Sequence, residues 1–367
     1  MFSYIHIPFC ESKCKYCRFA SVGSIDKILV KKYLAHLIFD INSYDKKIEK
    51  LDSIYFGGGT PSILTYDDLK NIIDNLKNKF GFKKDIEVTL ETTPKNINLE
   101  NLKSWEKLGI NRISFGIQTL NDKSLKEINR EGSSVTLKAL EILKESNIKN
   151  ISCDFIIGLP FVEIGETKKD IDFVLKNYNY LTHISVYMLE DYYQVDLDEN
   201  AKFEKIKYPN NWKSIGIEEN YYLREYLDIK NYLEKLGFFR YELSNFSKKG
   251  FECKHNKAYW NHSEMVGFGL GSHSFLNNTR YAYKDDFLGY YKKEFLYKEN
   301  LNENDLFLEK IMFGFRINGI NKDLFDKLDK EKLNYFLDKK ILEKNNDYIK
   351  INDNYITLTD KIISELI

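Results

Sequence analysis

The sequence predicts an α/β protein built on a partial (β/α)6 barrel, followed by a small C-terminal winged-helix-like domain. Two observations lead to this fold class. Short runs of β-branched and aromatic residues recur along the first half of the chain, and amphipathic helical patterns separate them. Strands that alternate with helices form βαβ units and a parallel sheet. The predicted strands are Phe2–Ile7, Ser53–Phe56, Ile86–Leu90, Arg112–Ile117, Ile151–Ile157 and Ile184–Met188.

The helical patterns between these strands place apolar residues on one face. Tyr66–Phe80 and Ser134–Ser146 are the plainest examples. Six strand–helix units fit an open barrel better than a closed barrel of eight strands. Because the chemistry of parallel barrels lies at the carboxyl ends of their strands, we expect functional side chains at those positions.

The chain is predicted to divide into a core at 1–232, a connecting segment at 233–299 and a C-terminal unit at 300–367. Lys205–Asn220 is irregular and contains Pro209, which suggests a break after the barrel. Helices followed by a small hairpin are typical of a winged-helix unit. In the last region we expect helices at Glu303–Phe315 and Asp323–Lys339, strands at Tyr348–Ile351 and Tyr355–Leu358, and a helical tail.

The composition excludes several classes. Lys+Arg and Asp+Glu both number 55, so the chain has no overall attraction for nucleic acid or an anionic membrane. Five cysteines, an odd number without framework spacing, argue against a disulfide scaffold. The first residues do not form a basic and then apolar leader, and no apolar run reaches about 18 residues. We therefore expect a cytoplasmic protein with no spanning membrane segment and no nucleic-acid partner.

Three cysteines follow the first predicted strand directly, in the pattern His6-Ile-Pro-Phe-Cys10-x3-Cys14-x2-Cys17. Thiolates suit both zinc and iron–sulfur clusters. One reading is a zinc site with His6 as the fourth ligand. The other is a four-iron cluster in which three thiolates leave one iron open, so that a small molecule with an amine and a carboxylate could chelate it. Spacing alone leaves both readings open.

Glycines and polar residues follow other predicted strands. Gly57-Gly58-Gly59-Thr60-Pro61-Ser62 comes after the second strand, where glycines allow close backbone approach to a ligand, although a tight turn is the simpler reading. A polar group beside a buried strand needs a partner or a ligand, or it caps the following turn. The polar residues at strand ends are Glu91, Gln118, Asp154 and Glu190.

Together these motifs resemble the radical-S-adenosylmethionine (SAM) superfamily. Its cysteine loop reads C-x3-C-x2-C with an aromatic residue before the last cysteine, here Tyr16. The resemblance implies a [4Fe-4S] cluster bound by Cys10, Cys14 and Cys17, with SAM on the open iron. It further implies cofactor contacts from Tyr4, Tyr16, Gly58, Gly59, Thr60, Glu91, Gln118, Arg130 and Asp154.

Within the superfamily, the chain resembles the oxygen-independent coproporphyrinogen III oxidase-like family along nearly its whole length. That family contains an oxidatively decarboxylating dehydrogenase and a branch of heme chaperones. The chaperone branch is favoured because Phe19 stands where the dehydrogenase has a fourth cysteine, and because the cluster loop begins by residue 10, without the long extension of the enzyme. His255–Trp260 also matches the HNxxYW segment of the chaperone branch. Arg18, Asn129-Arg130-Glu131 and Met188 depart from that branch and put the substrate-side lining in doubt.

The resemblance therefore implies a carrier that binds heme and delivers it to an unidentified acceptor protein. The alternative is a coproporphyrinogen III dehydrogenase, and a zinc-stabilised nucleic-acid binder is a third class that the neutral charge disfavours. His255 is the predicted heme ligand, with Cys253 as a competing axial donor. The simpler reading of His255 is a core histidine bonded to the backbone. Tyr259 and Trp260 would offer flat apolar faces, and Lys254 and Lys257 would face the propionates.

Overall fold

The computed structural model describes residues 1–23, 25–46, 49–189, 219–317 and 319–367. Six parallel strands form its centre and are hydrogen-bonded in the order of the sequence. The predicted strands are confirmed, and most extend by a few residues. They are β1 (Phe2–Ile7), β2 (Leu51–Gly58), β3 (Phe82–Thr92), β4 (Arg112–Gln118), β5 (Asn150–Ile157) and β6 (His183–Met188).

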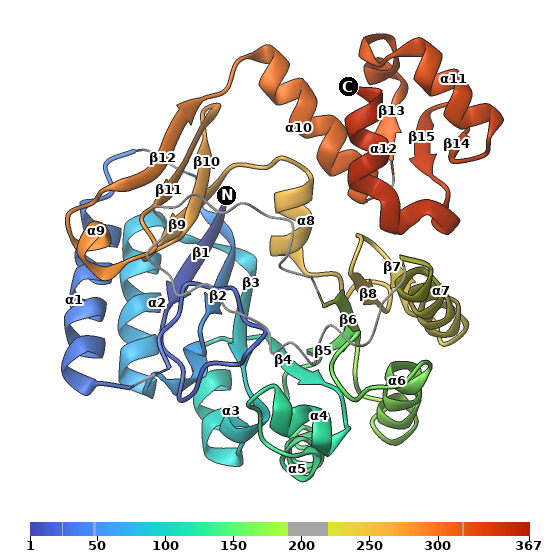
Figure 1. The fold of residues 1–367 in the computed structure, drawn as a ribbon. Helices are drawn as coiled ribbons and strands as arrows, with labels where there is room; N and C mark the ends of the chain where they lie inside the picture. The colour runs from blue at the N-terminus through green and yellow to red at the C-terminus, as the bar shows by residue number, and fades with distance from the viewer. Residues whose placement is uncertain (24, 47–48, 190–218, 318) are drawn as a thin grey trace.

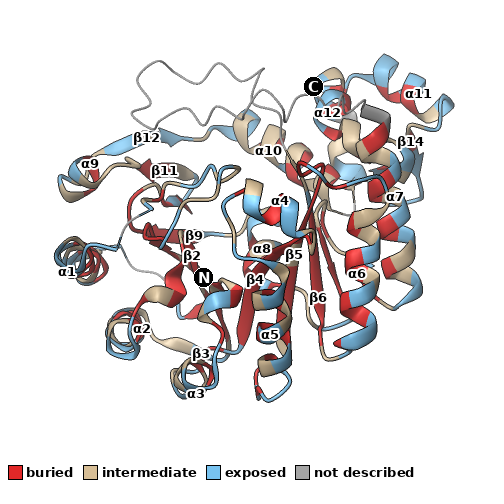
Figure 2. Cartoon of the chain, turned by 60° about the horizontal axis from the view of Figure 1, so that its bottom comes forward, coloured by how far each residue is buried: buried red, intermediate tan, exposed pale blue. Residues whose placement is uncertain are grey.

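Helices cover the outer face of these strands. In Figure 2 the strands form a curved, buried inner layer, and the helices around it expose their outer surfaces. They are α1 (Lys27–Ser43), α2 (Tyr66–Phe80), α3 (Leu99–Lys107), α5 (Ser133–Leu143) and α6 (Glu166–Asn177). The short helix α4 (Asp122–Glu127) lies instead near the carboxyl ends of the strands, where its Leu125 packs in one cluster with Ile156 and Tyr16. The predicted open (β/α)6 barrel is therefore present.

Helix α2 illustrates how local sequence sets an element. Thr65 and Asp68 form a capping box at its start, and Gly81, with φ of 69°, ends it in a conformation that favours glycine. Its buried residues are Leu69, Ile72, Ile73 and Leu76, which share one helical face against the sheet.

Further strands extend the sheet at both ends (Figure 1). Next to β1 lie β9 (Met265–Phe268), β10 (His273–Leu276), β11 (Thr279–Tyr283) and β12 (Phe295–Asn300). Next to β6 lie β8 (Asn245–Ser247) and β7 (Phe239–Arg240). The 233–299 segment thus adds strands to the barrel sheet, and the described part of the chain contains one sheet of 12 strands.

Helix α7 (Glu219–Lys235) leads into this segment, and α8 (Lys254–Trp260) and α9 (Phe287–Tyr291) lie within it. The start of α8 is held at the amino end of the barrel strands. Glu87 of β3 accepts hydrogen bonds from the backbone N–H groups of Lys254, at 3.0 Å, and His255, at 3.2 Å. A carboxylate at a helix start satisfies free N–H groups and complements the helix dipole, so Glu87 fixes α8 beneath the barrel.

The C-terminal unit contains helices and a three-stranded sheet in the order β13-β15-β14. Its elements are α10 (Glu303–Arg316), β13 (Ile320–Asn321), the 3-10 helix η5 (Lys322–Lys327), α11 (Lys330–Asp338), β14 (Leu342–Lys344), β15 (Tyr348–Ile351), the 3-10 helix η6 (Asp353–Leu358) and α12 (Thr359–Leu366). The unit is attached to the barrel through Asp353, which pairs with Lys230 at 2.9 Å and with Arg240 at 3.1 Å.

Two details of the predicted C-terminal unit are wrong. Tyr355–Leu358 is part of a 3-10 helix, not a strand, because the Asn352 side chain accepts from the N–H of Asn354 and starts a turn. The hairpin partner of β15 is β14 instead. The single helix expected at Asp323–Lys339 is divided in two, because the Asp329 side chain caps a new helix by accepting from Lys332 N–H.

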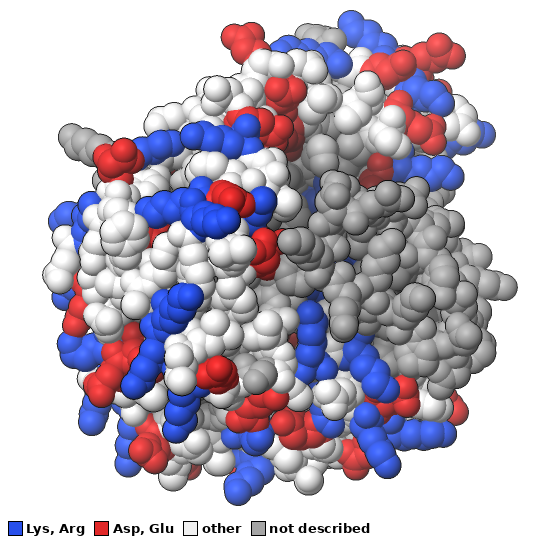
Figure 3. Space-filling model, turned by 60° about the vertical axis from the view of Figure 1, so that its left-hand side comes forward, with Lys and Arg blue, Asp and Glu red and all other residues white. Residues whose placement is uncertain are grey.

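The outer surface carries charges of both signs. Figure 3 shows Lys and Arg interspersed with Asp and Glu on one side of the molecule, as the zero net charge suggests. Among the described residues, no helix is both long enough and apolar enough to cross a bilayer.

Asp40 connects α1 to the sheet extension, the strands β9 to β12 with the helix α9 between them. Replacement of Asp40 is expected to destabilise the fold. Its buried carboxylate accepts from the hydroxyls of Tyr283 and Tyr290, both at 3.1 Å, and pairs with Lys293 at 3.3 Å. Asp40→Ala leaves two buried hydroxyls without a partner and should lower the free energy of unfolding by roughly 2–4 kcal/mol. Urea unfolding followed by circular dichroism measures this.

Asp74→Ala is the matched control for the Asp40 variant. Asp74 pairs with Lys70 on the surface, and both side chains are 49% exposed. Its loss should change stability by no more than about 0.5 kcal/mol. Equal unfolding midpoints for the two variants would show that the Asp40 cluster does not hold α1 to the sheet.

Candidate functional site

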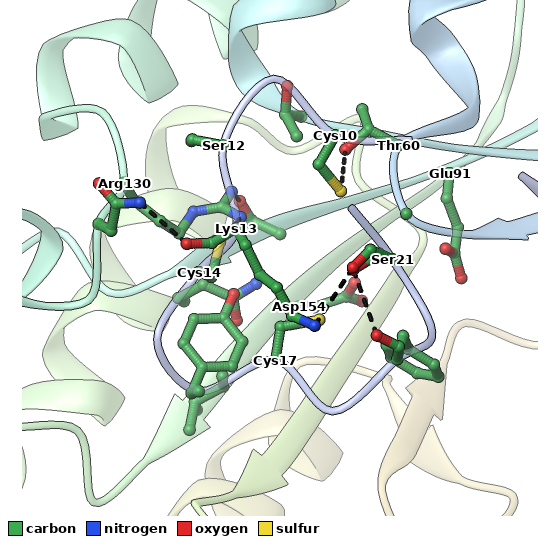
Figure 4. Close-up of a pocket in the computed structure, with 18 of the residues that line it drawn as sticks. Cys10, Ser12, Lys13, Cys14, Cys17, Ser21, Thr60, Glu91, Arg130 and Asp154 are labelled. Carbon is green, nitrogen blue, oxygen red and sulfur yellow. Dashed lines mark hydrogen bonds between the residues drawn. The ribbon is translucent and has the colours of Figure 1, made fainter. Parts of the chain in front are cut away.

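The three cysteines of the triad lie on one loop at the carboxyl end of β1. Backbone bonds close the base of this loop, from Cys10 N–H to Val22 O at 2.9 Å and from Val22 N–H to Pro8 O at 2.8 Å. A turn from Cys14 to Cys17 brings the last two cysteines together, with Cys17 N–H bonded to Cys14 O at 3.1 Å. All three cysteines line one cavity of about 410 Å³ (Figure 4).

The thiols of this loop are free and have donors beside them. Thr60 Oγ1 donates to Cys10 Sγ at 3.5 Å, and Arg130 Nη1 donates to Cys14 Sγ at 3.8 Å. Burial raises the pKa of Cys10 and of Cys17, so these two thiols stay protonated while no metal is bound. A bound metal would reverse that preference, because it binds the thiolate. The donor set of three sulfurs facing one cavity fits an iron–sulfur cluster.

His6, considered above as a fourth zinc ligand, is committed elsewhere. Its Nε2 bonds to Ala20 O at 2.7 Å, and its Nδ1 lies 3.3 Å from Tyr4 Oη. Burial lowers the pKa of His6 to about 4. His6 does not line the cavity of the thiols. The arrangement of the described residues therefore disfavours a Cys3His zinc site at this loop.

The glycine run packs against the base of the cysteine loop. Gly59 N–H donates to Ile7 O and Thr60 N–H to Phe9 O, each at 2.8 Å. Gly58 has φ of 107°, and a Cβ there would lie 2.5 Å from the His6 ring. The sequence left open whether a ligand or a tight turn requires glycine here, and the structure gives a third reason at Gly58, the close approach of the His6 side chain. The run also lines the cavity through Gly58, Gly59 and Thr60.

Two carboxylates project from strand ends toward the cavity. Glu91 of β3 accepts from Tyr55 Oη at 2.8 Å and from Gly58 N–H at 3.3 Å. Burial, with a contribution from the nearby Asp154, raises the pKa of Glu91 to about 7. Asp154 of β5 lies 3.5 Å from Ser114 Oγ, and burial raises its pKa as well. Both groups would be stabilised by a cationic ligand.

Gln118 and Arg130 complete the polar lining. Gln118 ends β4 with φ of 68°, and its buried Oε1 accepts no hydrogen bond from the described residues. A buried acceptor without a partner can take a hydroxyl or amine donor from a ligand. Arg130 Nη2 donates to Gly116 O at 2.5 Å, which holds the guanidinium over the β4 end.

The structure brings most of the sequence-predicted site residues into this one cavity. They are Cys10, Cys14, Tyr16, Cys17, Gly58, Gly59, Thr60, Glu91, Gln118, Arg130 and Asp154. Tyr4 and His255 do not line it. Glu190 lies outside the described residues.

Tyr4 and His255 lie together deeper in the barrel. Their rings are 6.3 Å apart, and both face Tyr55. His255 is 7% exposed, and its Nδ1 is 3.0 Å from Ser53 Oγ. This geometry gives His255 the contacts of a buried core histidine, and its predicted role as a heme ligand receives no support from its position. Tyr4 as a SAM contact likewise stays a prediction.

Sequence reasoning missed several residues that line the cavity. The missed residues include Thr92, Thr93, Ser114, Ile156 and Tyr187. Thr92 and Tyr187 lie near the carboxyl ends of β3 and β6, so the strand-end rule applied to every residue type would have found them. Phe19, which the sequence analysis singled out for its position after the triad, lines this cavity and is 62% exposed.

Known proteins resemble the chain over most of its length. The model of the radical SAM superfamily matches residues 4–174. The heme chaperone HemW of Buchnera aphidicola subsp. Acyrthosiphon pisum is 31% identical over 93% of this chain and 88% of its own length. The heme chaperone HemW of Lactococcus lactis is 30% identical over 100% of this chain and 97% of its own.

The fold also matches a solved enzyme. Coproporphyrinogen III oxidase (HemN) from Escherichia coli, a radical SAM enzyme, superposes with a TM-score of 0.81 over 99% of this chain and 89% of its own. Its sequence identity is 16%, so this likeness concerns the fold alone. The sequence relatives decide the branch: the chain belongs to the HemW family of radical SAM proteins.

Proposed function

We propose that this chain is a heme chaperone: it binds heme and delivers it to an acceptor protein, and it carries a [4Fe-4S] cluster with SAM. The observation that carries the cluster and SAM part is the single cavity shared by three cysteines and the polar ends of β2, β3, β4 and β5. The heme part rests on the relatives, which are named heme chaperones. The cytoplasm is the compartment we propose, and the identity of the acceptor stays open.

In this proposal Cys10, Cys14 and Cys17 hold the cluster. A [4Fe-4S] cluster held by these three thiolates would have one iron without a protein ligand, and that iron would take the amine and carboxylate of SAM. The chain contributes the hydrogen bonds from Thr60 and Arg130 to the sulfurs of Cys10 and Cys14. Such bonds stabilise thiolates and tune a cluster's potential.

The same cavity offers groups for SAM. Glu91 and Asp154 provide negative charge for a sulfonium or ammonium group, and Gln118 Oε1 provides an unpaired acceptor. Thr60, Gly59 and Arg130 line the same cavity, and Figure 4 shows Thr60 beside Cys10. These residues would bind and orient SAM.

The alternative activity, oxidation of coproporphyrinogen III, has less support. The chain resembles HemN in its fold, but the two sequences are only 16% identical. Phe19 fills the place of the fourth cysteine of that enzyme, and its exposed apolar ring cannot act as a thiol acid or ligand. We therefore rank the carrier above the enzyme.

Cluster formation is expected to depend on the triad alone. After anaerobic reconstitution the chain should hold about four irons and four sulfides. Cys10→Ala, Cys14→Ala or Cys17→Ala removes a ligand and should abolish stable incorporation, measured by iron and sulfide analysis. Cys153→Ala is the matched control, because Cys153 is a buried thiol of β5 that does not line the cavity. One zinc per chain without sulfide would contradict the assignment.

SAM affinity is expected to depend on the charge of Glu91. Its pKa is raised to about 7, so the carboxylate is charged above that pH and neutral below it. Attraction for a cationic ligand is therefore complete near pH 8 and lost as the pH falls through 7. Glu91→Gln should lower SAM affinity by about ten- to hundredfold at pH 8, which corresponds to roughly 1.5–3 kcal/mol.

Titrations of reconstituted protein with SAM at pH 8 and pH 6 measure both effects. The wild type should bind more weakly at pH 6, and Glu91→Gln should show a smaller dependence on pH. Wild-type affinity in the variant at both pH values would remove Glu91 from the SAM site.

The proposed function is tested by two assays on the same reconstituted protein without oxygen. Heme titration followed by absorbance should show saturable binding of one heme per chain. Incubation with coproporphyrinogen III, SAM and a reductant should give no protoporphyrinogen above a cluster-free control. Absence of heme binding would refute the chaperone proposal, and clear protoporphyrinogen formation would favour the enzyme.

A further inference from the structure

A second cleft lies between the sheet extension and the C-terminal unit. It is formed by β9, β10, β11 and β12, by the end of α8 and by α10, which lie close together in Figure 1. Its volume is about 160 Å³, and its lining includes Tyr259, His262, Met265, His273, Tyr297 and Phe313. Two imidazoles, a thioether and aromatic rings in one cleft are groups that bind a metal-containing aromatic ligand.

The cleft opens on the inner face of the sheet, the face that also bears the cluster site. Met265 is paired with Phe2 on one side and with Phe275 on the other. Directly opposite residues point to the same face, as do residues two apart on one strand. Tyr4 is two residues from Phe2 and His273 is two residues from Phe275, so Tyr4 and His273 lie on the same face of the sheet. This is the inner face, because Tyr4 bonds to His6 inside the barrel.

His273 is set up as a ligand. Its Nδ1 lies 2.8 Å from Tyr297 Oη, which fixes the ring, and no hydrogen bond of the described residues involves its Nε2. Histidines that bind metals commonly have the other ring nitrogen held in this way. The side chain of His273 is exposed at the cleft, yet partial desolvation by its neighbours, assisted by the charge of Arg280, lowers its pKa, so the ring is neutral at pH 7. The neutral ring is the form that coordinates iron.

The other histidines of this region are engaged differently. His255 is buried and bonded to Ser53, and it does not line the cleft. His262 Nε2 pairs with Glu309, whose carboxylate also accepts from Arg280 at 2.6 and 2.8 Å. The His262 ring packs on Phe275 at 4.3 Å. His262 therefore joins α10 to the sheet and shapes the cleft.

Aromatic rings form a wall of the cleft. Tyr259 is 42% exposed, and its ring lies 5.3 Å from Phe313 and 5.0 Å from Trp260. An exposed tyrosine backed by the buried ring of Phe313 and the half-buried ring of Trp260 gives a firm apolar surface for a flat macrocycle. Tyr259 and Trp260 belong to the segment His255–Trp260 that sequence analysis connected with heme.

We propose that heme inserts one edge into this cleft, with His273 Nε2 as the axial ligand and Tyr259 against the ring. This inference rests on the proposed function and names the heme site. Cavities that enclose a ligand of this size measure roughly 300–1,000 Å³. A cleft of about 160 Å³ holds only part of the macrocycle, so most of the heme stays exposed. Partial exposure suits a carrier, because an acceptor protein can reach the heme before release.

The test is heme titration of the full-length, reconstituted chain, with absorbance spectra of wild type and variants. His273→Ala should weaken heme affinity at least tenfold and shift the Soret band, and added imidazole should restore the wild-type band. Tyr297→Phe removes only the hydroxyl that orients His273. It should weaken affinity severalfold while keeping the wild-type band, as expected for a positioning residue.

His36→Ala and His255→Ala are the controls. His36 lies on α1 against Tyr290 and Tyr291 and does not line the cleft. Both variants should bind heme like the wild type. Wild-type affinity and spectrum in His273→Ala overturn the cleft assignment while heme binding itself stands, and loss of ligation in His255→Ala alone overturns it in favour of His255. A wild type that binds no heme refutes the proposed function and the site together.

If His273→Ala fails to fold, Tyr297→Phe tests the proposed heme site instead, because this variant keeps the imidazole ring of His273 and the aromatic ring of residue 297. Unchanged heme affinity in Tyr297→Phe then counts against the site. Circular dichroism and cluster content establish that each variant is folded.

Discussion

Arg112 places a positive charge inside the barrel, and much of the interior is arranged around it. The residue is 2% exposed, and its Nε and Nη1 have no hydrogen-bond partner among the described residues. A buried guanidinium is costly unless negative groups compensate it. Glu87 supplies such a charge, and it also holds the start of α8. The position of α8, and with it that of Tyr259, thus depends on charge balance at the amino end of the barrel.

The same charge acts on the opposite end of the barrel. It opposes the rise in pKa that burial causes at Asp154 and Glu91. Nearer the amino end, burial lowers the pKa of His183 and His255, and the charge of Arg112 adds to that effect. The carboxylates of the cluster cavity are therefore easier to ionise than burial alone would allow. A single interior arginine links the helix beneath the barrel to the electrostatics of the cofactor site.

How much could be predicted from the sequence depends on how local each feature is. The parallel strands and α2 were predicted because their patterns repeat over several residues, and the triad because its spacing lies within one loop. The strands added beside β1 and β6 were missed for two reasons. β7 and β8 have two and three residues, too few for a periodic pattern, and β12 has six residues but no buried face, so it lacks the alternation of a half-buried strand. Tyr355–Leu358 resembles a strand by composition, but the Asn352 cap overrides that preference.

The two proposed sites also combine features set by neighbouring residues in the sequence with features that depend on residues far apart in it. Nothing near Cys14 in the sequence indicates that Arg130 will donate to its sulfur, since the two are 116 residues apart. His273 received no role from the sequence, because its setting is made by Tyr297, Arg280 and α10 rather than by its neighbours. His255 was singled out by its motif, and the fold buried it. Motifs reveal chemistry within a loop, whereas chemistry assembled across strands requires the structure.

An open barrel differs from a closed one in having free edges, and these need protection against pairing with other chains. In the described part of the sheet, β7 ends one side with two residues, which is too short a template for another strand. The other edge, β12, is longer and largely exposed, but it carries Lys298 and Glu299. Charges on an edge strand oppose intermolecular sheet formation and aggregation. The barrel can therefore stay open to its ligands without offering an uncharged edge to its neighbours.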